Sequence, residues 1–180
     1  VYAASLIFND QGEQVARFDK IHLFDVRLKE GQLIYNESAT IKPGNDIVVF
    51  DSPFGRIGVA VCYDLRFPEL FRAMVDQGAE VILLPSAFTA QTGQAHWEPL
   101  VRARAIENLA YVVAADQAGY HLNGRASHGH SVVVDPWGGI VAQLDSSVPG
   151  VVVGEIKLDC LRSTRKTFPV LEHRRFNFQE

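Results

Sequence analysis

The chain has 180 residues, of which 47% are hydrophobic and 21% charged, as expected for one globular domain with a sizeable core. Its net charge of -4, spread without a basic stripe, argues against nucleic acid as a partner, and no apolar run approaches the roughly 18 residues of a membrane span. Cys62 and Cys160 are too few for a disulfide framework, which favours a reducing, cytoplasmic compartment.

Short runs rich in valine and isoleucine alternate with turn residues, which favours strands over long helices. The turns at residues 9–13 and 52–55 each join two such runs and predict hairpins. We expect strands at residues 1–8, 14–18, 47–50, 56–61, 80–84, 111–115, 131–134, 140–144 and 151–156. Residues 25–43 and 116–129 are the longest irregular stretches, and loops of such length in compact domains are usually functional or mobile.

Three segments are predicted to be helices. Residues 68–77 begin with a proline in the first turn and stop at Gly78. Residues 97–109 place apolar side chains along one side, and residues 158–166 form a shorter candidate. Strands mixed with helices around one unbroken core predict a layered α/β or α+β architecture, with residues 1–180 as a single domain.

Residues 58–64 read GVAVCYD and are the segment most suggestive of chemistry. An apolar strand ends at Cys62, and a predicted helix follows from Pro68. Such a strand-turn-helix lifts a nucleophile out of a sheet, leaves the next backbone N–H free to meet an oxyanion, and favours a thiolate near the helix start. A small core cysteine at a strand end is the alternative, and both interpretations stay open on this segment alone.

Two charged residues are further candidates. Lys20 lies in KIHLF at residues 20–24, at a strand end, where its ammonium group could stabilise an oxyanion or lower a thiol pKa. A solvated lysine is the commoner case for such a residue. Glu37 stands at the end of a long loop, where it could orient a lysine or a substrate amide, or simply be a surface acid.

The histidines suggest two other kinds of site. His128 and His130 are two residues apart, so on a strand they would share a face and could ligate zinc, but the sequence offers no obvious third ligand. A Cys–His pair that uses His96, His128 or His130 is also possible, and no spacing selects one of them.

Taken together, these segments resemble the nitrilase superfamily, also called the carbon–nitrogen hydrolases, over about residues 1–176. Residues 20–24 resemble its lysine motif, and GVAVCYDLRFPE at residues 58–69 resembles its highly specific cysteine motif. The nearest resemblance is to the Nit branch, the deaminated glutathione amidases. It is carried by PSAF (85–88), GQAHWE (93–98), RARAIEN (102–108) and GHSVVVDPWG (129–138).

The resemblance implies a four-layer α-β-β-α sandwich, usually dimerised, and a Glu–Lys–Cys catalytic set without a metal or other cofactor. Cys62 would be the nucleophile, Lys20 the cation beside the oxyanion, Glu37 the acid that positions the lysine and the substrate, and the Tyr63 backbone N–H an oxyanion donor. The family's general-base glutamate would precede residue 1. We therefore expect a family member that lacks roughly the N-terminal third of the domain.

The implied reaction is hydrolysis of a small linear amide with a carboxylate, such as deaminated glutathione, through a Cys62 thioester with release of ammonia. The alternatives are an ω-amidase, an N-carbamoyl hydrolase, or a catalytically dead fragment that acts only as a binding or assembly module. By itself, the chain is expected not to turn over amides. We also expect a homo-oligomer, at least a dimer, with residues 97–109 and the aromatic, arginine-rich tail at 168–178 in the contact.

Overall fold

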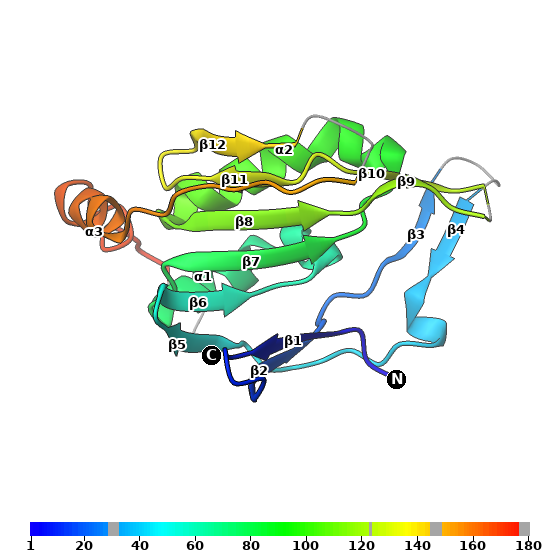
Figure 1. Ribbon diagram of the computed structural model, residues 1–180, viewed down its shortest axis with the longest axis horizontal. Coiled ribbons are helices and arrows are strands. Elements are labelled where there is room, and N and C mark those ends of the chain that lie inside the picture. Colours follow the sequence, from blue (N-terminus) through cyan, green and yellow to red (C-terminus); the bar gives the residue numbers. More distant parts are fainter. Residues whose placement is uncertain (29–32, 123, 145–148, 177–180) are drawn as a thin grey trace.

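The computed structural model describes residues 1–28, 33–122, 124–144 and 149–176. Its main feature is a six-stranded sheet in which β6, β7 and β8 are parallel neighbours and the remaining pairs are antiparallel (Figure 1). The strand order is β12 (Ile140–Gln143), β11 (Val132–Val134), β8 (Tyr111–Asp116), β7 (Val81–Ser86), β6 (Gly55–Val59) and β5 (Val49–Ser52).

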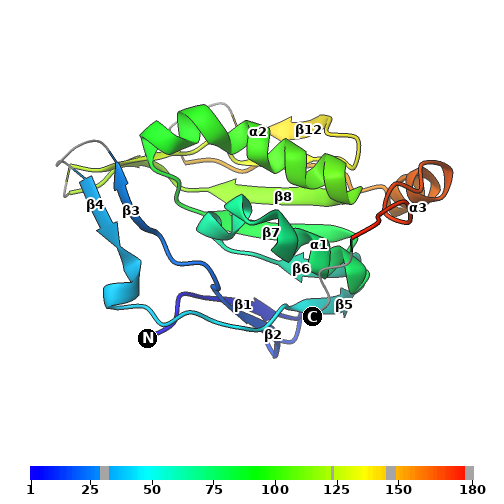
Figure 2. The same ribbon diagram turned by 180° about the vertical axis from the view of Figure 1, so that it is seen from behind.

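Two helices connect the parallel strands and cover one face of the sheet (Figure 2). Helix α1 (Pro68–Asp76) lies between β6 and β7 in the chain, and α2 (Ala90–Asn108) lies between β7 and β8. Parallel strands need such crossover connections because the chain must return to the same end of the sheet. The carboxyl ends of β6 and β7 therefore lie at the same end of the sheet, which is where an α/β sheet usually binds its ligand.

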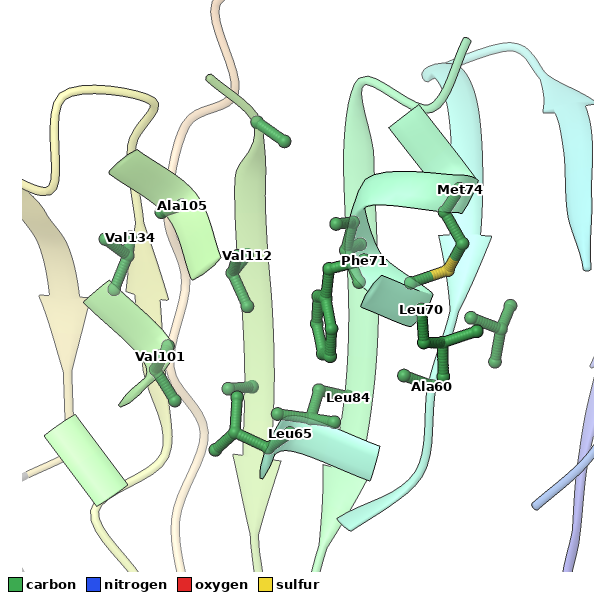
Figure 3. Close-up of a cluster of buried hydrophobic side chains, with 14 of the residues drawn as sticks. Ala60, Leu65, Leu70, Phe71, Met74, Leu84, Val101, Ala105, Val112 and Val134 are labelled. Atoms are coloured by element: carbon green, nitrogen blue, oxygen red, sulfur yellow. The ribbon is translucent and has the colours of Figure 1, made fainter. Parts of the chain in front are cut away.

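The core lies between these helices and the sheet (Figure 3). Phe71 and Met74 of α1 are fully buried against strand residues such as Leu84 and Val112. Gly58 permits this close packing, because a Cβ atom there would stand 2.8 Å from the Met74 sulfur. A second cluster, formed by Ile57, Val81, Tyr111 and Leu161, joins β6, β7 and β8 to α3 (Leu158–Thr167).

Helix α2 begins seven residues before the predicted start at residue 97. Thr89 caps it, since its hydroxyl oxygen accepts the Thr92 N–H at 3.2 Å. Gly93, in the first turns of α2, is buried against His128, and a Cβ atom at this position would stand only 2.2 Å from the Cβ of His128. This contact requires a glycine, although glycine is an unfavourable residue inside a helix. The helix ends at Asn108, and the next residue, Leu109, caps it with a left-handed φ of 44°.

Most predicted strands are confirmed, but residues 151–156 are a correction. They run extended on the sheet face opposite α1 and α2, yet they join no ladder (Figure 1). Gly154 lies against the Val133 side chain, and the Lys157 N–H donates to the Tyr111 hydroxyl at 3.2 Å. Side-chain packing rather than strand pairing therefore holds this segment.

Both stretches predicted to be irregular contain short hairpins instead. One is β3 (Asp25–Leu28) with β4 (Leu33–Asn36), followed by the 3-10 helix η1 (Glu37–Ala39). The other is β9 (Ala118–Tyr120) with β10 (Ala126–His128). Strands of three or four residues carry too few side chains for an alternation to be recognised.

The expected layered α+β class is confirmed. The described chain supplies the main sheet, its helix layer and a separate two-stranded sheet, β1 (Ala4–Phe8) with β2 (Gln14–Asp19). None of the helices in the described ranges is long and apolar enough to cross a membrane. Of the tail that was predicted to form an interface, Phe178 lies outside the described residues.

Candidate active site

Cys62 stands in the turn that follows β6 and is the first residue of the 3-10 helix η2 (Cys62–Arg66). Its φ of 51° lies in the left-handed region, which costs a non-glycine residue on the order of 1 kcal/mol. Nucleophiles are presented on such strained strand-to-helix turns. The predicted strand-turn-helix is thus confirmed, with the extra feature that η2 precedes α1.

Asp64 braces this turn against a second segment of the chain. Its fully buried carboxylate accepts the Val61 N–H at 2.9 Å through Oδ2. Oδ1 accepts the His22 backbone N–H at 3.0 Å and lies 2.8 Å from the His22 ring Nδ1. The stretch that carries Lys20 is thereby fastened to the stretch that carries Cys62.

Lys20 follows β2, and its side chain is only 5% exposed. Its Nζ lies 2.5 Å from Oε2 of Glu37, the first residue of η1. The same oxygen accepts the Phe24 N–H at 2.7 Å. The structure therefore brings Lys20 and Glu37 into direct contact, and the same carboxylate oxygen is bonded to the backbone at Phe24.

A cavity of about 940 Å³ brings the predicted residues together. Lys20, Glu37, Cys62 and Tyr63 all line it. The Tyr63 N–H belongs to the first turn of η2, where a helix offers its own amides no acceptor. Glu37 is the only carboxylate among the described lining residues.

The pKa of Cys62 is raised, chiefly because the thiol is buried. A hydrogen bond from the Ala87 backbone and the charge of Lys20 act in the opposite direction, while Asp116 and Glu37 add to the rise. The charge of Lys20 thus favours the thiolate, as expected, but the burial of the thiol outweighs it. A proton acceptor must act before Cys62 can attack a carbonyl carbon.

Arg66 is a cavity residue that sequence reasoning did not single out. Its guanidinium carbon lies 5.9 Å from the Tyr63 ring centroid and 5.4 Å from that of Phe88, and Nη1 is 3.3 Å from the His96 Nδ1. No ion pair between Arg66 and a carboxylate occurs within the described ranges. Its place at the end of the 3-10 helix that begins at Cys62 was the available signal, because a helix this short keeps its residues near the cysteine.

The histidines do not form either site suggested by their spacing. The rings of His128 and His130 are stacked with centroids 4.4 Å apart, and the part of the chain that the structure describes has no cluster of three metal-ligating side chains. Neither of them, nor His96, is among the described residues that line the cavity. Cys160 is exposed on α3, outside the cavity lining.

Comparisons with known proteins point to one family. The family model for carbon-nitrogen hydrolase matches residues 1–166. The deaminated glutathione amidase of Yersinia enterocolitica is 49% identical over 98% of this chain and 61% of its own length. The chain therefore spans about three fifths of that curated relative.

Solved structures show the same relationship. The NitFhit protein of C. elegans superposes with a TM-score of 0.90 at 46% identity, over 97% of this chain and 42% of that one. An amidase from Nesterenkonia, in a structure with acrylamide added at the active-site cysteine, has a TM-score of 0.73 at 29% identity, over 92% of this chain and 61% of that one.

Proposed function

The chain belongs to the carbon-nitrogen hydrolase family, and from that premise we propose that it is the nucleophile-bearing part of a cysteine-dependent amidase. Cys62 attacks the amide carbon, Lys20 and the Tyr63 N–H hold the oxyanion, and Glu37 positions Lys20. The single observation that carries the proposal is the convergence of these four residues on one cavity. The cysteine adduct in the Nesterenkonia amidase supports the choice of nucleophile.

The reaction proceeds by acyl transfer. The Cys62 thiol loses its proton, and its sulfur forms a bond to the amide carbon while the carbonyl electrons move to the oxygen. Collapse of this intermediate breaks the C–N bond, the departing nitrogen takes up a proton, and water then hydrolyses the thioester to a carboxylic acid and the free thiol. Buried donors aimed at the oxyanion give such a site most of its effect on rate.

The proton transfers need a group beyond the described cavity residues. Glu37 is their only carboxylate, and its Oε2 already bonds both Lys20 and the Phe24 N–H. A carboxylate that is engaged in this way is better suited to holding the lysine in place than to transferring protons. We therefore assign Glu37 to positioning and leave the general base outside this set.

For the substrate we propose a small linear amide with a carboxylate, and deaminated glutathione is the first candidate, because the curated relatives bear that name. Arg66 supports a carboxylate, since its guanidinium lines the cavity beside Tyr63 and carboxylates pair well with arginine. The scissile bond of such a substrate joins two residues, so the leaving group would be an amine. Ammonia, the sequence-based expectation, would leave only from a primary amide, as in an ω-amidase.

Acylation by an activated ester tests this function without requiring the proton relay to a leaving nitrogen. Two acyl donors are compared. One is an aryl ester of a dicarboxylic acid that keeps its second carboxylate, and the other is the matched ester without that carboxylate. We expect the carboxylate-bearing ester to acylate the protein faster, and Arg66→Gln to slow that ester by about tenfold, or 1.4 kcal/mol, without affecting the neutral one.

Arg162→Gln is the matched control, because Arg162 pairs with Glu80 and does not line the cavity. Cys62→Ala gives the background rate. If both esters react at the Cys62→Ala rate with the wild-type chain, the proposal is wrong and a non-catalytic binding or assembly module becomes the better account. The raised pKa of Cys62 favours this second candidate function, because a protonated thiol is a poor nucleophile.

We also propose a homo-oligomer in a cytoplasmic setting. Ile106 of α2 is exposed, and the rings of Trp137 and Phe168, 67% and 48% exposed, lie 5.5 Å apart. Aromatic surfaces of this kind favour protein contacts. Light scattering at micromolar concentration tests the proposal, and a monomer would contradict it.

A further inference from the structure

Asp116 is the last residue of β8 and pairs with Ser86 at the end of β7. It does not line the cavity, but the segment that follows its partner does, from Ser86 through Thr89. The Asp116 side chain thus lies one layer behind the cavity wall that faces Cys62. The proposed mechanism assigns it no role.

The carboxyl group of Asp116 is nearly inaccessible, at 6% exposure of the residue. Oδ1 accepts the Phe88 N–H at 2.8 Å, whereas Oδ2 is buried with no hydrogen-bond partner among the described residues. A buried carboxyl oxygen without a partner is unfavourable, so native proteins seldom keep one without a reason. Burial raises the pKa of Asp116 to about 7, against two backbone N–H groups that lower it.

The hydrogen bond between Asp116 and Phe88 connects Asp116 to Cys62 through the neighbouring residue Ala87. Phe88 follows Ala87, and the Ala87 backbone donates to the Cys62 thiol and lowers its pKa. The charge of Asp116 has the opposite effect, because a carboxylate disfavours a second negative charge nearby. Asp116 therefore acts on Cys62 in two ways, by holding a donor in place and by its own charge.

The other titratable groups around this pair are few. Lys20 and Glu37 act on Cys62 from the opposite side of the cavity wall. His128 is the last residue of β10, and its N–H donates to the Phe88 carbonyl at 2.9 Å, while His130 follows two residues later. The pKa of His128 is lowered by burial and by His130, so this ring adds little positive charge near neutral pH.

We propose that Asp116 is a positioning residue for the nucleophile: its buried carboxyl group holds the Ala87–Phe88 backbone against Cys62. A proton on Asp116 removes the negative charge that opposes a thiolate and leaves the hydrogen bond to Phe88 in place. The thiolate still becomes rarer as the pH falls, so the effect of the Asp116 charge is measured as a shift of the Cys62 titration midpoint. This inference concerns the thiol itself and holds whether or not amides are the substrate.

The test is the pH dependence of Cys62 alkylation by iodoacetamide, followed peptide by peptide with mass spectrometry. Cys160, exposed on another element, serves as the internal reference. In the wild type, the pKa of Asp116 is about 7 and that of Cys62 is raised above the ordinary thiol value, so Asp116 is already charged where Cys62 titrates. Asp116→Asn keeps an oxygen for the Phe88 N–H without the charge, so the Cys62 midpoint should fall by on the order of half a pH unit.

A second variant separates the two roles. Asp116→Ala lacks both the charge and the acceptor, so its Cys62 midpoint should lie above that of Asp116→Asn, because the Ala87 donor is no longer held. Asp116→Ser, also uncharged, replaces Asp116→Asn if the latter does not fold. An unchanged Cys62 curve in the uncharged variant would overturn the charge role, and coincident curves for Asp116→Asn and Asp116→Ala would overturn the positioning role.

Discussion

The carboxylate of Asp64 joins His22 to the cysteine turn, with Oδ1 2.8 Å from the His22 Nδ1 and 3.0 Å from the His22 backbone nitrogen. Because Lys20 is two residues before His22, this buried side chain helps to fix where the lysine stands relative to Cys62. The cavity therefore depends on a contact between segments 42 residues apart in the chain.

Asp64→Ala should destabilise the fold by roughly 3 kcal/mol or more, since it leaves the Val61 and His22 N–H groups without their charged acceptor. Urea unfolding measures the change. Asp51→Ala is the matched control, because the Asp51 side chain is 87% exposed and should contribute less than about 0.5 kcal/mol. Equal stabilities of the two variants would show that the brace is unimportant.

Lys20→Met should slow acylation of Cys62 by the carboxylate-bearing ester by about 10²–10³, the usual loss for one oxyanion donor. The double variant Lys20→Met/Glu37→Gln should recover stability, because no carboxylate stays unpaired, but not rate. Lys42→Met controls for the loss of a lysine outside the cavity lining. If only the ester concentration for half-saturation changes, Lys20 binds substrate and its assigned role is incorrect.

Folding stability should fall with rising pH because of Asp116. Its folded pKa of about 7 lies above the ordinary value of 3.8, so the folded state binds the proton more tightly and this stability is lost between about pH 4 and pH 7. The slope is at most about 1.4 kcal/mol per pH unit. The stability advantage of Asp116→Asn should therefore grow through this range and then level off. A constant difference between the two proteins would rule this out.

The 180-residue chain, supplied with a saturating ω-amide, should release less than one equivalent of ammonia above the Cys62→Ala background. General acid–base catalysis contributes about 10²–10⁴ in rate, and the only carboxylate among the described cavity residues is engaged with Lys20 and Phe24. Steady-state release over many turnovers would place the proton relay within this chain.

The strong local patterns were predictable from the sequence. The apolar strand before Cys62, the proline at the start of α1 and the glycine after its end each reflect a local backbone preference. The first turns of α2 were missed because Gly93 is selected by its contact with His128, which is distant in sequence. Residues 151–156 alternate like a strand but pack on side chains without a pairing edge.

The candidate site was also predictable only in part. Lys20, Glu37 and Cys62 were proposed through family motifs, and their convergence is visible only in three dimensions. Burial was the factor that sequence reasoning could not weigh. It raises the pKa of Cys62 against the opposing charge of Lys20, and it raises the pKa of Asp116, a residue with no distinguishing sequence pattern.

We propose above that Cys62, in its cavity with Lys20 and the Tyr63 N–H, is an acyl-accepting nucleophile. The most direct measurement is peptide-resolved mass spectrometry after brief exposure of the protein to the carboxylate-bearing aryl ester. We predict the acyl mass on the peptide with Cys62 about ten times faster than on the peptide with Cys160, although Cys160 is the exposed thiol. Equal or faster acylation of Cys160 would contradict the account.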